Sequence, residues 1–66
     1  MLGMVEKIQN KKWRSYKNYG FISGYDGEHY FFVLDGHEDL KVGDEVSFEG
    51  RLNEKGYYAR HVKKKN

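Results

Sequence analysis

The chain has 66 residues, a net charge of +2, and neither cysteine nor proline. This length predicts one domain and is too short for a deep catalytic pocket together with a cofactor-binding lobe. The lack of cysteine excludes disulfides and the usual structural zinc sites. A domain of about 60 residues buries only roughly 60% of the surface of its unfolded chain, so side-chain packing must supply the stability. Much of the apolar material is aromatic, with six tyrosines, four phenylalanines and one tryptophan.

Five short strands are predicted, because glycines separate short apolar runs and helical periodicity is nearly absent. Their approximate ranges, in chain order, are 4–10, 19–24, 29–34, 44–52 and 57–62. The expected connections are a basic loop at 11–18, hairpin turns at 25–28 and 53–56, and a polar segment at 35–43. We therefore predict an all-β fold: a small five-stranded antiparallel barrel, either of the oligonucleotide-binding type or a related SH3-like roll. One domain would cover residues 1–66, ending in a short basic tail at 63–66.

The net charge conceals a division along the chain. Residues 1–19 carry +4, residues 20–50 carry −7, and residues 51–66 carry +5. If the two basic ends lie together in the fold, they form a positive face opposite an acidic one, which is typical of a protein that binds a polyanion. On charge alone, a solvated surface without a ligand is an equally good interpretation.

Strand alternation sorts the aromatic residues between two faces. If Ile22 points into the core, Tyr19 and Phe21 point outward from the same strand. In the segment 29–34, Tyr30 and Phe32 are expected inside, so Phe31 points outward. It should then lie beside Tyr19 and Phe21 on the neighbouring strand. The alternation therefore predicts a cluster of three exposed rings.

The remaining rings include the predicted core residues Tyr30, Phe32 and Phe48. A barrel of this size has limited room for all eleven aromatic rings, and an exposed cluster usually marks a contact site. Unpaired bases stack on such rings, and Lys17 would place a cation at the edge of the cluster. The alternative is that these rings pack in the core or under a loop.

Two segments resemble the ribonucleoprotein motifs of the cold-shock domain. Residues 17–22, Lys-Asn-Tyr-Gly-Phe-Ile, resemble the first motif, and residues 29–34, His-Tyr-Phe-Phe-Val-Leu, resemble the second. The nine positions from Ile22 to Phe31 match the family's usual spacing. Further similarities are found at Gly3, Val5, Leu40, Gly43, Val46, Ser47, Phe48, Glu49, Gly56, Ala59 and Val62. The resemblance implies an oligonucleotide-binding barrel for single-stranded RNA or DNA, with Tyr19, Phe21 and Phe31 in the places of the base-stacking aromatics.

The chain departs from this family at several binding positions. With Val5 aligned, Lys7 stands where the family has a stacking tryptophan, and the stretch before the first motif is five residues longer. An alternative register puts Trp13 at that position but brings Lys11 and Arg14 to core positions. We prefer the first register, with Trp13 on an extended basic loop that folds over the cluster.

The second motif departs as well. Its leading acid is His29 here, and its histidine and final phenylalanine are Val33 and Leu34. Asn18 replaces a glycine of the first motif. These changes affect the expected affinity and base preference more than the expected fold.

The sequence therefore predicts a binder of single-stranded RNA or DNA, with RNA chaperoning as a consequence of weak, unspecific binding. The stacking residues would be Tyr19, Phe21, Phe31 and Trp13, and the phosphate-binding residues would be Lys7, Lys11, Lys12, Lys17 and Arg60. The alternative is a protein-interaction barrel that has lost nucleic-acid binding. Within the nucleic-acid class, a ribosomal-protein-type RNA-binding barrel is the second candidate family.

Other functions find no support in the sequence. His29 and His37 lack recognised metal-ligand spacing, and no nucleophile motif or phosphate-binding loop is present. We expect no catalytic residues, metal or cofactor. No apolar run is long enough to cross a membrane and no signal-peptide core is found, so we expect no membrane contact. Because cysteine is also absent, we expect a cytoplasmic protein. We further expect a monomer.

Overall fold

The computed structural model describes residues 1–9, 18–34 and 39–65, which form five strands and no helix. The strands are β1 (Leu2–Gln9), β2 (Tyr19–Gly24), β3 (His29–Val33), β4 (Glu45–Asn53) and β5 (Gly56–Lys64). Each predicted strand is present, and β2 has the predicted bounds. Residues 11–17 of the predicted basic loop, including Trp13, lie outside the described residues.

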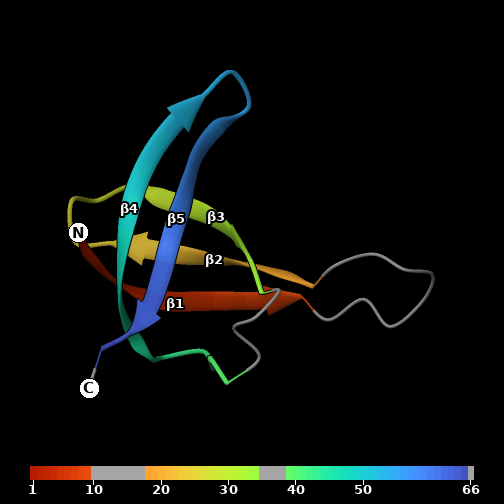
Figure 1. Ribbon diagram of the computed structural model, residues 1–66, viewed down its shortest axis with the longest axis vertical. Helices are drawn as coiled ribbons and strands as arrows, with labels where there is room; N and C mark the ends of the chain where they lie inside the picture. The colour runs from red at the N-terminus through yellow and green to blue at the C-terminus, as the bar shows by residue number, and fades with distance from the viewer. Residues whose placement is uncertain (10–17, 35–38, 66) are drawn as a thin grey trace.

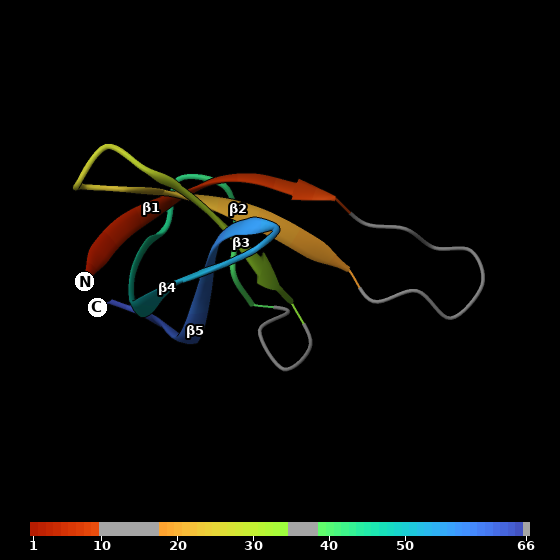
Figure 2. The same cartoon turned by 90° about the horizontal axis from the view of Figure 1, so that it is seen from above.

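The five strands close into a barrel in the order β1-β2-β3-β5-β4, and β4 pairs back with β1 (Figure 1). Seen from above, β1 and β2 lie on one side, and β4 and β5 complete the barrel on the other (Figure 2). This arrangement confirms the predicted all-β, five-stranded barrel of the oligonucleotide-binding kind. One pairing differs from the antiparallel prediction, because β3 and β5 run parallel. An odd number of strands in a closed ring cannot alternate in direction throughout, so at least one neighbouring pair must be parallel.

The core is formed by side chains from all five strands and from the segments that follow β3. Its buried residues are Val5, Ile22, Tyr30, Phe32, Leu34, Leu40, Val46, Phe48 and Val62. The inward orientation predicted for Ile22, Tyr30, Phe32 and Phe48 is confirmed. Full burial of such side chains contributes about 1.5–3 kcal/mol each to stability.

A glycine in β2 makes room for a core ring. Gly20 pairs with Phe32 on β3, and a Cβ at Gly20 would lie 2.9 Å from the Phe32 ring and 2.5 Å from the carbonyl oxygen of Lys7. Gly20 also lets β1 approach β2 closely, because a side chain at this position would collide with the backbone of Lys7. Tyr19 and Phe21, the two outer rings of β2, flank this glycine.

Both predicted hairpin turns are present. Gly27 in the β2–β3 turn has a φ of 94°, and Gly56 after the β4–β5 turn has a φ of 126°. This left-handed region is accessible to glycine without steric cost. The β4–β5 hairpin extends beyond the strands of the barrel (Figure 1).

Two β-bulges interrupt the alternation of side chains. In β1, Val5 pairs with Ile22 and Lys7 with Phe21, so Glu6 is an extra residue. In β5, the register shifts at His61, which has a φ of 55°. A bulge inserts one unpaired residue, so the residues beyond it change faces.

The C-terminal strand is longer than predicted. Lys63 pairs with Ser47 and Lys64 with Val46, so these lysines belong to β5 and not to a tail. The backbone amide of Lys65 also donates to the carbonyl oxygen of Glu45, at 2.8 Å. The pairing of β5 continues to its end because Glu45, Val46 and Ser47 at the start of β4 provide backbone partners for residues 63–65.

Candidate functional site

Three aromatic rings form a cluster on the outer face of β2 and β3. The ring centroids are 5.5 Å apart for Tyr19 and Phe31, 5.9 Å for Phe21 and Phe31, and 6.1 Å for Tyr19 and Phe21. Phe31 is 38% exposed, and the other two side chains are half-buried. The cluster forms because Phe21 pairs with Phe31 across the two strands, while Tyr19 follows Phe21 at the two-residue spacing of one strand face. The predicted aromatic cluster is confirmed as a structural feature.

The cluster belongs to a longer row that crosses all five strands. Lys7 pairs with Phe21, Phe21 with Phe31, Phe31 with Tyr58, and Tyr58 with Arg51. The row therefore has three aromatic residues in the middle and a basic residue at each end. Neighbouring strands lie about 4.8 Å apart, so consecutive side chains are within contact distance.

A groove of about 610 Å³ lies where the aromatic cluster meets the β4–β5 hairpin. Phe21 and Phe31 line it from β2 and β3, while Tyr57 and Tyr58 line it from β5. Its remaining lining residues are His29, Asn53, Lys55 and Gly56. The groove thus combines aromatic side chains from two directions with polar and cationic groups.

A hydrogen-bonded histidine and glutamate lie at one side of this groove. The Nδ1 of His29 lies 2.6 Å from the Oε1 of Glu6 on β1. Glu6 is the extra residue of the β1 bulge, so the bulge brings its carboxylate to the outer face beside Lys7. This contact occupies Nδ1 and leaves Nε2 as the ring nitrogen that can meet another polar group.

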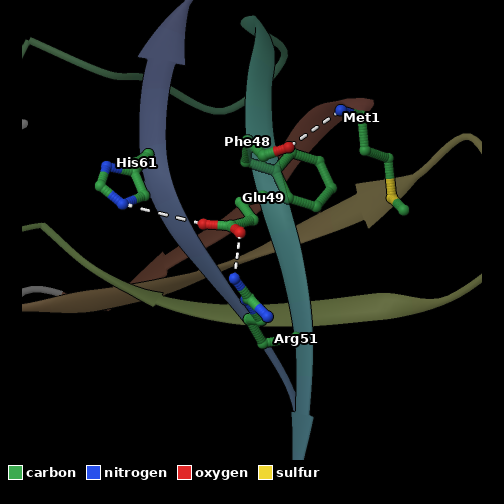
Figure 3. Close-up of polar contacts among 5 residues, drawn as sticks. All are labelled: Met1, Phe48, Glu49, Arg51 and His61. Carbon is green, nitrogen blue, oxygen red and sulfur yellow. Dashed lines mark hydrogen bonds and ion pairs between the residues drawn. The ribbon is translucent and has the colours of Figure 1, made fainter.

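The charged residues of β4 and β5 lie close to one another. The Glu49 carboxylate accepts a hydrogen bond from Arg51 and lies 3.7 Å from Nε2 of His61 (Figure 3). Lys64 Nζ lies 3.7 Å from Oδ2 of Asp44. Acids of the middle segment are therefore interleaved with bases of the last segment. The predicted separation into a positive and an acidic face is not found at these two strands.

The predicted binding residues have the following places. Tyr19, Phe21 and Phe31 come together, and Lys7 opposes Phe21 from β1. Arg60 is exposed on β5, two residues from Tyr58 and therefore on the same strand face. The other four predicted residues, Lys11, Lys12, Trp13 and Lys17, lie outside the described residues.

Sequence reasoning identified Arg60 but missed the two tyrosines that β5 contributes, Tyr58 above all. Val62 is buried, and strict alternation from Val62 places Arg60 and Tyr58 inside the barrel. The bulge at His61 reverses this assignment. Ala59 is the sequence signal for the correct orientation of Tyr58. It is a small residue between two large side chains, and it packs against the core, so its neighbours Tyr58 and Arg60 point outward.

The described residues hold no group of three or more histidine, cysteine, aspartate or glutamate side chains that could bind a metal ion. They also include no helix long and apolar enough to span a membrane. The aromatic row and its groove offer a surface that a ligand could use.

Comparison of the chain with protein-family models, with curated proteins and with solved structures found no match.

Proposed function

We propose that this protein binds single-stranded RNA or DNA through the aromatic cluster of Tyr19, Phe21 and Phe31. The observation that carries the proposal is the outward clustering of these three rings within 6.1 Å of one another on two adjacent strands. A base that stacks on such a ring contributes about 1–3 kcal/mol, and stacking tolerates any sequence because every base has a π-face.

Two basic residues support the proposal. Lys7 adjoins the cluster directly, as the partner of Phe21, and Arg60 shares the outer face of β5 with Tyr58. Cations at the edges of an aromatic cluster are suited to the phosphates between stacked bases. The five-stranded barrel and the motif-like segments in β2 and β3 are also compatible with a divergent cold-shock domain. Cytoplasmic location, a monomeric state and RNA chaperoning are predictions that accompany this proposal.

The proposal is tested by titrating the protein with oligo-U and oligo-dT at low salt, following amide chemical shifts and Trp13 fluorescence. Phe21→Ala and Phe31→Ala should each weaken binding by about 5- to 150-fold, the equivalent of one lost stacking contact. Tyr25→Ala is the matched control, because Tyr25 is a 59% exposed ring in the β2–β3 turn and no member of the cluster. Its affinity should equal that of the wild type.

Thermal unfolding of each variant separates loss of binding from loss of fold. If the wild type shows no shift changes with either oligonucleotide, the proposal is wrong and the protein-interaction barrel becomes the better hypothesis. If the two phenylalanine variants unfold, the rings belong to the core and not to a binding surface.

A further inference from the structure

The β4–β5 hairpin places a fourth aromatic ring in line with the cluster. Tyr58 pairs with Phe31 across the parallel β3–β5 contact, and Arg51 pairs with Tyr58 on the next strand. The bulge at His61 turns Tyr58 to this face. Without the bulge, Tyr58 would share the inward face of Val62. The outer face therefore continues from β3 onto the hairpin.

The groove begins at this junction. Phe21, Phe31 and Tyr58 form part of its walls, with Lys55 at the turn of the hairpin. A flat aromatic ligand fits such walls, because it can stack on a ring face while its edge meets polar groups. His29 and Asn53 provide polar groups in the lining.

We propose that this groove is a second nucleotide subsite, in which one base of the bound strand stacks on Tyr58 and its phosphate contacts Lys55. The inference rests on the proposed function. A continuing nucleic-acid strand is the occupant that fits best, since the groove is contiguous with the cluster and offers a ring and a cation. A peptide that binds by strand addition would need a free strand edge, and the β1–β4 and β3–β5 pairings occupy those edges. A peptide that docks against aromatic side chains instead is the alternative occupant, and Lys55 in the lining favours the strand that carries phosphates.

The chemistry of His29 adds a means of recognition to the subsite. In the neutral imidazole whose Nδ1–H donates to the Glu6 carboxylate, the ring is held in place and Nε2 accepts a hydrogen bond from the edge of a base. Uracil and thymine carry a ring N–H donor on their pairing edge. The subsite should therefore favour these bases over cytosine, whose corresponding ring nitrogen is an acceptor.

Oligonucleotide length separates the two subsites experimentally. A strand of about three nucleotides is long enough for the cluster, whereas one of about eight, within the range for such barrels, also covers the hairpin. Tyr58→Ala should weaken binding of the longer oligo-U by about 5- to 150-fold and leave the shorter one unchanged. Tyr58→Phe, which keeps the ring, should restore the affinity. Leu52→Ala is the matched control, because Leu52 is 66% exposed in the same hairpin and does not line the groove.

Phe21→Ala in the same titrations distinguishes failure of this inference from failure of the proposed function. If Phe21→Ala weakens both lengths and Tyr58→Ala weakens neither, the cluster binds nucleic acid but the groove is not a subsite. Equal loss at both lengths for Tyr58→Ala would also overturn a separate subsite. Amide shifts at Lys55 and Tyr58 that appear only with the longer strand would support it.

Discussion

Tyr30 connects the barrel core to the β2–β3 turn through a single hydrogen bond. Its ring is 3% exposed and packs against Phe48, with 4.9 Å between the centroids. Its hydroxyl donates to Oδ2 of Asp26 at 2.6 Å, while Oδ1 of Asp26 accepts from the backbone amide of Glu28. The bond to Asp26, followed by burial, raises the pKa of Tyr30 to about 12, and the bond from Tyr30 is the main cause that lowers the pKa of Asp26. One bond thus orders the turn that joins the two strands of the cluster.

This bond predicts a loss of stability in alkali. The pKa of Tyr30 is higher in the folded chain than its usual 10.0, so the unfolded chain releases this proton first and the contribution of Tyr30 falls between about pH 10 and 12. Below pH 10 the contribution is complete. We expect the stability advantage of the wild type over Tyr30→Phe to shrink across this window, as measured by urea unfolding at a series of pH values. Parallel curves for the two proteins would show that the hydroxyl makes no such contribution.

At the scale of whole strands, the two bulges decide which residues accompany the cluster. Strict alternation suffices for β2 and β3, where Ile22 and Phe32 point inward and Phe21 and Phe31 outward as predicted. Alternation fails in β1 and β5, because one extra residue in each strand reverses the faces beyond it. A bulge depends on pairing with a neighbouring strand, which a single sequence does not display. The cluster could therefore be predicted from sequence, whereas Tyr58 and the groove could not.

The bulge in β5 contains His61, whose backbone is in the left-handed conformation that favours glycine. His61 has a φ of 55°, a region that costs a residue with a side chain about 1–2 kcal/mol and that β-branched residues tolerate least. We expect His61→Val to lower stability by about 1 kcal/mol, or Tm by about 4–8 °C, and His61→Gly to be neutral or stabilising. Lys63→Val is the control, because Lys63 is exposed and extended in the same strand. Equal effects of the two valine substitutions, measured by thermal unfolding, would contradict a special role for the bulge.

For the molecule as a whole, ion pairs divide the basic residues into two groups. Lys64 lies 3.7 Å from Asp44, and Arg51 donates to Glu49, so acids in β4 and just before it balance part of the positive charge of the last segment. Lys7 instead stands at one end of the aromatic row, and Arg60 lies two residues from Tyr58 on the same strand face, opposite Glu49. The net charge of +2 therefore says less about binding than the position of each cation relative to the row.

This division predicts which lysines and arginines control the salt dependence of binding. Each phosphate that a protein neutralises on a single strand adds about −0.7 to the slope of log affinity against log salt concentration, because a counterion is released. Lys7→Gln and Arg60→Gln should each make the slope for oligo-U shallower by about 0.7. Lys64→Gln should leave it unchanged, since Asp44 already balances that charge. Affinity measured at several salt concentrations for the three variants gives the slopes. If all three reduce the slope equally, the attraction is a diffuse property of the whole surface, and the aromatic row does not define the path of the strand.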